Sequence, residues 1–350
     1  MKKQLRGNYL PALTWNWLDV NDTEIDLQNE NQVPYTAAQG EGEIDQDLRT
    51  EFLKLDHGIS DEVLEMNKNQ SNLKNHFVIN SNQEIFLNLP MSKSNPLLVD
   101  QQQIIVPALQ SGTVVLYNYS EDDSRAERNS TIIIDIANDA ELNLVVIQRL
   151  NNKSSSNVAI MARVGDGSKL NTASIELGSA NTVFHYMVDL EGFASESHVQ
   201  TAYLGRGEEK LDLFYHIHHI GEECISNLQI NGALMDKSIK KFRGTIDFVK
   251  GCSGSDGNEE EFCVLLDDTV HAIAVPILLA GEDDIVGNHA ASAGKIDENQ
   301  LFYLMARGLS RKEAEGLIVE SRMTAAFDQI PDAELRQDLK TEIHERIINR

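Results

Sequence analysis

The feature that most constrains this chain is a set of turn residues repeated at constant spacing within a β-rich stretch. Four residue pairs recur at 27-residue intervals: Leu150-Asn151, Leu177-Gly178, Leu204-Gly205 and Asn231-Gly232. Ile160, Met187 and Phe214 keep the same step. A unit of this size holds two short strands and two turns, and it can bury its apolar side only by stacking on its neighbours. The repeat therefore predicts a mainly β fold, a right-handed parallel β-helix (solenoid).

The pattern around the repeat predicts the boundaries of this solenoid. From about Phe77 to Ile285, short β-rich runs alternate with turn residues. We expect an N-terminal, partly helical region over 1–76, a β-helix core over 77–290 and a C-terminal helical region over 291–350. A β-sandwich is the alternative, because its strands also recur at roughly 8–12 residues, but it needs no constant longer period. A solenoid has open ends, and each has to be capped or paired.

The last sixty residues carry clear helix signals. Asp297 and Ser310 are placed to cap two helices, the first ending at Gly308 and the second near Phe327. Asp332, after Pro331, can cap a third. The apolar side chains of this last helix follow each other at i, i+4 spacing and must pack on something: Leu335, Leu339, Ile343 and Ile347.

Composition excludes several classes of function. With 30 Lys and Arg against 55 Asp and Glu, the formal charge is −25, which repels nucleic acid and anionic lipid. The first twenty residues contain no continuous apolar run, and no stretch approaches a membrane span, so we expect a cytoplasmic protein. Motifs of serine hydrolases, zinc peptidases and nucleotide-binding proteins are missing. The three thiols are expected to be buried rather than to bind metal: Cys224, Cys252 and Cys263.

The histidines offer the most ligand-like groups. In the run His216-Ile217-His218-His219, His216 and His218 would point to one face of a strand and His219 to the other. At most two of them could share a metal without help from elsewhere, so we expect structural roles, with His219 hydrogen-bonded in the core. Acidic residues in turns also suggest a solenoid enzyme that cleaves polysaccharides, a less favoured alternative: Asp166, Glu196 and Glu222.

His289 lies in a different context, where the solenoid is expected to give way to the helices. Small residues follow it in the sequence GNHAAS, which leaves the imidazole accessible. An accessible neutral imidazole can bind a transition metal. His289 is therefore the candidate metal ligand, although a plain surface role explains the residue as well.

The junction around His289 resembles the C-terminal signature of SufB/SufD proteins. The matching segment is GNHAASAGKIDENQLFYLMARGLSRKEAEGLIVESRMTAAF, and further likeness upstream includes Phe242-Arg243-Gly244 and Ser255-Asp256-Gly257. The likeness covers roughly residues 130–330. In that signature a Cys lies two residues before the His, whereas this chain has Gly287. Thiolates are the usual iron ligands, so this chain could supply an imidazole but not the principal Cys.

The resemblance implies a β-helix with helical ends and a non-enzymatic scaffold of the SufD-like type. It implies a SufB-like subunit and a SufC-like ATPase as partners, the latter bound through the C-terminal helices. We expect the apolar stripe of the last helix either to dock this partner or to anchor the helix that does: Leu335, Leu339, Ile343 and Ile347. It also implies a transient iron–sulfur cluster at the subunit interface, with His289 as a candidate ligand, and no cofactor held tightly by the lone chain. A SufB-like or homodimeric scaffold that holds a cluster by itself is the alternative. In isolation the chain could also form a homodimer.

Overall fold

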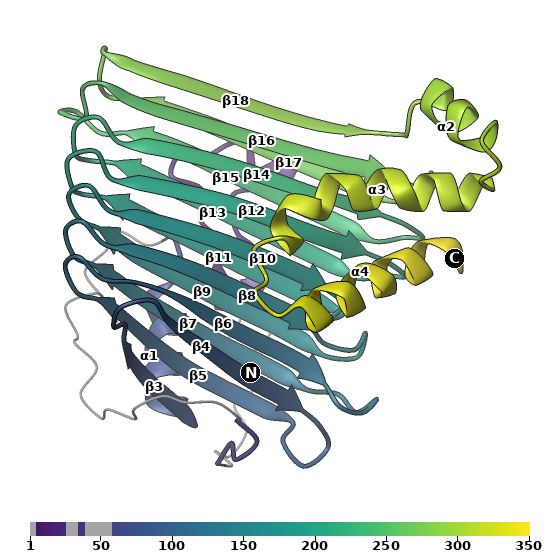
Figure 1. The fold of residues 1–350 in the computed structure, drawn as a ribbon, viewed down its shortest axis with the longest axis horizontal. Coiled ribbons are helices and arrows are strands. Elements are labelled where there is room, and N and C mark those ends of the chain that lie inside the picture. Colours follow the sequence, from purple (N-terminus) through teal and green to yellow (C-terminus); the bar gives the residue numbers. More distant parts are fainter. Residues whose placement is uncertain (1–4, 26–33, 39–57) are drawn as a thin grey trace.

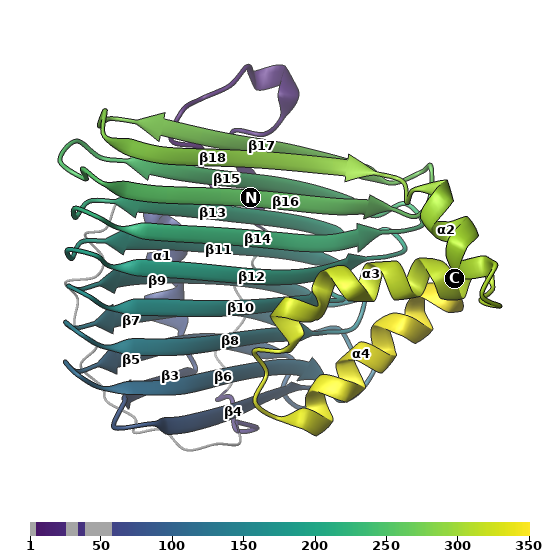
Figure 2. The same ribbon diagram turned by 45° about the horizontal axis from the view of Figure 1, so that its top comes forward.

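Two long parallel sheets, wound from one continuous chain, dominate the molecule (Figure 1). The structure is a computed structural model, and it describes residues 5–25, 34–38 and 58–350. The chain alternates between the sheets, so that each coil contributes one strand to each sheet. The "odd sheet" contains β3, β5 and so on to β17, and the "even sheet" contains β4, β6 and so on to β18. The chain rises as a right-handed solenoid (Figures 1 and 2), as the repeat predicts.

Most strands are nine to eleven residues long, and their ends are set by turns. The odd sheet consists of β3 (Leu73–Val78), β5 (Leu97–Val106), β7 (Glu127–Ile136), β9 (Ser155–Val164), β11 (Asn181–Leu190), β13 (Lys210–His219), β15 (Ile239–Phe248) and β17 (His271–Ala280). The even sheet consists of β4 (Gln83–Met91), β6 (Ser111–Ser120), β8 (Glu141–Arg149), β10 (Lys169–Leu177), β12 (Glu196–Gly205), β14 (Ile225–Leu234), β16 (Ser255–Leu265) and β18 (Ile285–Gly294).

The constant 27-residue period is wrong in detail. Leu177 does pair with Leu204, a step of 27, but Leu204 pairs with Ala233, a step of 29. The step is 26 between Ser155 and Asn181. The cause is the length of the turns: residues 178–180 join β10 to β11, whereas residues 249–254 join β15 to β16. The strands thus set the stacking, and the turns absorb insertions at the rim of the solenoid.

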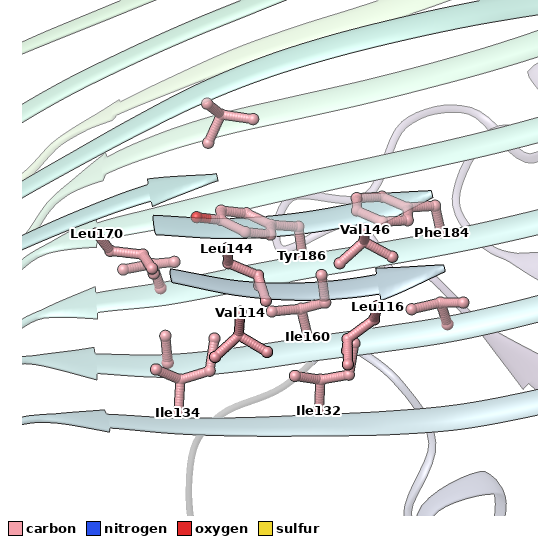
Figure 3. Close-up of a cluster of buried hydrophobic side chains, with 14 of the residues drawn as sticks. Val114, Leu116, Ile132, Ile134, Leu144, Val146, Ile160, Leu170, Phe184 and Tyr186 are labelled. Atoms are coloured by element: carbon pink, nitrogen blue, oxygen red, sulfur yellow. The ribbon is translucent and has the colours of Figure 1, made fainter. Parts of the chain in front are cut away.

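The core lies between the two sheets, where aliphatic side chains from successive coils stack in columns. Figure 3 shows part of it, including Val114 and Leu116 of β6, Ile132 and Ile134 of β7, and Tyr186 of β11. The outer faces of the sheets are also covered in their middle. The strands of the middle coils are therefore buried on both faces over much of their length, which is typical of parallel sheets.

The C-terminal helices cover the even sheet. They are α2 (Glu298–Met305), α3 (Arg311–Phe327) and α4 (Ala333–Ile348), with Asp297, Ser310 and Asp332 as the N-caps, as predicted. The capping box between Ser310 and Glu313 is formed in both directions. Among the described residues, each helix is too short or too polar to cross a bilayer.

The described part of residues 1–76 holds more than helix. Two short strands, β1 (Leu5–Gly7) and β2 (Thr23–Ile25), pair antiparallel, and a 3₁₀ turn spans Asn16–Leu18. One α-helix, α1 (Asp61–Gln70), packs with these strands on the odd sheet. The rest of the predicted N-terminal region, residues 1–4, 26–33 and 39–57, lies outside the described residues. The first solenoid strand begins at Leu73 and the last ends at Gly294.

Candidate functional site at the open end of the solenoid

The last coil leaves the C-terminal end of the solenoid open. Strands β17 and β18 are the terminal strands of their sheets. In β15 most residues are buried, whereas none of the residues in β17 or β18 is. The edge is apolar, and Val286, for example, is 55% exposed. An exposed edge with apolar side chains is a template for pairing with another chain.

Pro276 shapes this edge. The backbone N–H groups of His271 and Gly281 donate to carbonyls of the inner neighbour, Ser238 and Phe248. Backbone donors alternate in direction along a strand. The N–H groups of odd-numbered residues in β17 therefore point toward β15, and the backbone nitrogen of Pro276 points away from it, toward the open edge. Proline has no N–H, so the outward row of donors is broken in the middle of β17. A continuous ladder to a second chain is therefore better formed along β18.

His289 lies on this open end, in β18. It pairs in register with Glu259 of β16, which is fully buried between the sheets, so the His289 side chain faces the same interior side. β18 is the last strand of its sheet, no further coil of the described residues stacks on it, and His289 is exposed. Gly287, two residues earlier, has the same orientation, because a Cβ atom there would come within 2.7 Å of Leu278 Cδ1. Position 287 and His289 thus point into the mouth of the solenoid together.

Buried charged groups lie directly beneath the mouth. The Lys240 Nζ atom is 2.7 Å from Glu261 Oε1, and both side chains are fully buried. The Tyr203 hydroxyl donates to the same carboxylate at 2.8 Å. Glu259 has no hydrogen-bond partner; burial, followed by repulsion from Glu261, raises its pKa to about 8. Gly244 leaves the space that this carboxyl occupies, because a Cβ atom would lie 2.1 Å from Glu259 Oε2.

The thiols do not contribute to the mouth as ligands. Cys224, Cys252 and Cys263 are all buried and unpaired, as expected from the sequence. Burial raises the pKa of Cys263 to about 11, so this thiol stays protonated at neutral pH. A protonated, enclosed thiol is a poor metal ligand. The His289 imidazole, in contrast, is accessible at the open end.

The apolar stripe of the last helix is buried against the solenoid. Leu339, Ile343 and Ile347 are fully enclosed in a cluster with side chains of α3 and of the even sheet, and Leu335 packs at its margin. These side chains thus anchor α4. The exposed apolar residues of the C-terminal region lie elsewhere, on α2 and on the outer side of α3: Phe302, Tyr303, Met305 and Leu317. Sequence reasoning missed this surface, although LFYLM contains more apolar residues than one helix face can bury.

The histidine run divides between the two faces of β13, as predicted. His219 is fully buried, its Nε2 lies 2.8 Å from Ser226 Oγ, and burial lowers its pKa to about 4. His216 and His218 lie on the outer face, with ring centroids 4.0 Å apart.

The acidic residues of the polysaccharide-cleaving alternative have local partners. Glu196 lies 2.8 Å from both Lys169 Nζ and His198 Nε2, and Asp166 accepts from the Phe193 N–H. Glu222 is an exposed turn residue between β13 and β14.

Comparison with known proteins connects this fold with one family. A family model described as "SUF system FeS cluster assembly, SufBD core domain" matches residues 90–322, which is more than half of the chain and includes the whole open end. The chain belongs to the SufBD family. The resemblance seen in the sequence around His289 is thus confirmed over most of the solenoid.

Two relatives of this SufBD chain carry the SufD name. "Iron-sulfur cluster assembly protein SufD" of Bacillus subtilis is 28% identical over 171 residues, which are 49% of this chain and 39% of that protein. SufD of Escherichia coli is 24% identical over 174 residues, which are 50% and 41% of the two chains. A SufBD family protein of Galdieria sulphuraria is 27% identical over 163 residues, or 74% of its length. The match spans about two fifths of each SufD relative.

Proposed function

We propose that this SufD-like chain is a non-catalytic scaffold subunit for iron–sulfur cluster assembly, and that it pairs with a SufB-like subunit through its open end. The observation that carries the proposal is the uncapped last coil. Strands β17 and β18 expose apolar side chains and an unpaired edge, which a folded monomer rarely leaves uncovered. A SufB-like chain with the same kind of open end could continue the even sheet along β18 and cover β17.

The composition of the mouth supports the SufD-like half of such a pair. Position 287 is Gly, and the three thiols are buried, so the sulfur ligands of a nascent cluster would come from the partner. His289 would contribute one imidazole from this side. The cluster is cargo, held in transit between two subunits. The alternative of a scaffold that holds a cluster by itself requires thiolates that the described open end does not present.

A SufC-like ATPase would dock on the C-terminal helices, at the exposed residues of α2 and α3 rather than at the anchored stripe of α4. Phe302 is 74% exposed and Tyr303 is 57% exposed. A hollow between the two helices, lined among others by Leu304, Ile318 and Arg322, adjoins them. Aromatic residues beside a hollow are typical of the energetic centre of an interface.

Replacing His289 with Ala in the complex reconstituted with SufB-like and SufC-like proteins tests the ligand role. Because the side chain is exposed, we expect normal folding and normal pairing, with cluster loading reduced several-fold. Iron and sulfide content and the visible absorption of the complex measure the loading. His271→Ala, which removes another exposed histidine at the start of β17, is the matched control. Full loading of the His289→Ala complex would refute the ligand role, and failure of the wild-type chain to pair would refute the proposed assembly.

A further inference from the structure

A cluster of two imidazoles and two carboxylates lies on the outer face of the odd sheet, away from the open mouth. His216 and His218 of β13 project from this face, and Asp247 follows on β15, where it is the register partner of His218. Asp189 of β11 is the register partner of His218 on the other side. The three strands are neighbours in the odd sheet (Figure 1), whereas His289 belongs to the even sheet.

The ligand atoms converge on one point. The Nε2 atoms of His216 and His218 both lie 3.8 Å from the same oxygen, Asp247 Oδ2. One ligand atom from each of the three residues lies within 4.8 Å of the other two. In a tetrahedral site with metal–ligand distances of about 2.0–2.1 Å, ligand atoms are about 3.4 Å apart. The two separations from Asp247 Oδ2 are therefore within about half an ångström of this geometry.

His218 is oriented for this purpose by Asp189. Its Nδ1 lies 2.7 Å from Asp189 Oδ1, which leaves Nε2 as the free ring nitrogen facing Asp247. Metal-binding histidines commonly donate their second ring N–H to a carboxylate in this way, which fixes the tautomer and makes the ligand more basic.

His216 supplies the second, independent observation. His216 is 6% exposed, and its Nε2 atom is buried without a hydrogen-bond partner. The distance of 3.8 Å from Nε2 to Asp247 Oδ2 is too long for a hydrogen bond. A buried polar atom left unpaired is unfavourable unless something else binds it. Burial lowers the pKa of His216, which favours the neutral imidazole that metals bind. The side chains of His218 and Asp247 are 14% and 24% exposed, so an ion can reach the site from solvent.

We propose that His216, His218 and Asp247 bind one divalent first-row transition-metal ion, Zn²⁺ or Fe²⁺, with Asp189 positioning His218. Two imidazoles and one carboxylate suit these ions, whereas Mg²⁺ and Ca²⁺ prefer oxygen ligands alone. The protein supplies three ligands, so at least one coordination position stays open to solvent. The site is independent of the proposed scaffold function, because it uses neither His289 nor the open end.

The test titrates the metal-free full-length chain with Co²⁺, whose visible absorption reports the ligand set, and with Zn²⁺ by calorimetry. The wild type should bind one ion of each, and Fe²⁺ under anaerobic conditions shows whether iron also enters. His218→Ala and Asp247→Asn should each weaken binding by at least about tenfold, and Asp189→Asn by about 10–100-fold. Asp247→Asn keeps the shape of a partly exposed side chain, so it stays informative if His218→Ala does not fold.

Two histidine variants serve as controls. His198→Ala removes a histidine of the even sheet that pairs with Glu196, and His271→Ala removes an exposed histidine at the start of β17. Both should bind Co²⁺ with the affinity and spectrum of the wild type. Absence of stoichiometric binding to the wild type, or unchanged affinity in both His218→Ala and Asp247→Asn, would overturn the site. So would loss of binding in His198→Ala or His271→Ala.

Discussion

At the scale of single residues, the Glu259 carboxyl couples folding to pH. It is fully buried beneath the open mouth, has no hydrogen-bond partner, and lies near a second carboxylate, Glu261. The pKa of Glu259 is raised from 4.5 to about 8, first by burial and then by this neighbour. The unfolded chain releases the proton near pH 4.5, whereas the folded chain keeps it until about pH 8. Folding is therefore favoured most at low pH, and this contribution is lost as the pH rises.

Glu259→Gln should remove this pH dependence. The difference in free energy of unfolding between the variant and the wild type should increase by roughly 2–4 kcal/mol in favour of the variant as the pH is raised from 5 to 8. A pKa difference of one corresponds to about 1.4 kcal/mol. Urea unfolding at both pH values measures the gain, and Glu260→Gln, at the exposed neighbouring position, is the control. The pKa of His219 is lowered to about 4, so this residue reduces the stability of the fold as the pH falls from about 6.5 to 4. The wild type and both variants share this effect, so it cancels in the comparison. Identical slopes for wild type and Glu259→Gln above pH 5 would contradict the assignment.

At the scale of elements, the C-terminal helices have two different sides. The inner sides of α3 and α4 join the even sheet in one cluster, through Val319, Met323, Phe327 and the α4 stripe. The outer side of α3 and most of α2 carry the exposed apolar residues. Deleting residues 309–350 would remove both sides and uncover the even sheet, so a loss of partner binding after that deletion would be ambiguous. A point substitution on the outer side separates docking from folding.

Phe302→Asp should weaken binding of the SufC-like ATPase by at least about tenfold, because it places a charge where an aromatic side chain would be buried in the complex. The melting temperature of the chain should stay the same, since Phe302 is 74% exposed. Leu109→Asp, at another exposed apolar residue, in the turn between β5 and β6, is the matched control. Co-purification and a binding titration measure the effect. Equal affinity of Phe302→Asp and wild type would place the docking surface elsewhere.

At the scale of the whole molecule, the two ends of the solenoid differ. At the first end, Tyr35 enters the interior cluster, and its hydroxyl donates to the Pro90 carbonyl at 2.7 Å. At the other end the described residues place no such cap over β17 and β18. The N-terminal segment nevertheless reaches the open end, where it rises beside β17 in Figure 2. Leu10 and Val20 pack there with Ile273 and other residues of β17.

This N-terminal segment carries both tryptophans of the chain, Trp15 and Trp17, which are 72% and 74% exposed. If a SufB-like subunit covers the open end, it should bury them as well, and their fluorescence emission should shift to shorter wavelength. A titration monitored by fluorescence measures this shift, and a Trp15→Phe/Trp17→Phe double variant gives the signal of the partner alone. The SufC-like ATPase by itself should cause no shift. Complex formation without any tryptophan shift would show that the partner binds away from this segment.

The sequence by itself determined those features that depend on neighbouring residues. Ser310 and Glu313 lie within one helical turn, so their capping box could be predicted, as could the Asp297 and Asp332 caps. Strand alternation also placed His216 and His218 on one face and His219 on the other. The recurrent turns predicted a solenoid, because each unit is too small to bury its own apolar face.

Only the tertiary structure decided what lies between coils. Asp189, His218 and Asp247 follow each other at intervals of 29 residues and are register partners on neighbouring strands. A constant 27-residue period would not have paired them, because turn length varies from coil to coil. The α4 stripe was visible, but its target, the even sheet, is formed from strands far away in the chain. That β17 and β18 remain uncovered depends on where the chain leaves the solenoid. Local sequence specifies strands and caps through short-range hydrogen bonds, whereas burial depends on surfaces that exist only once all the coils are stacked.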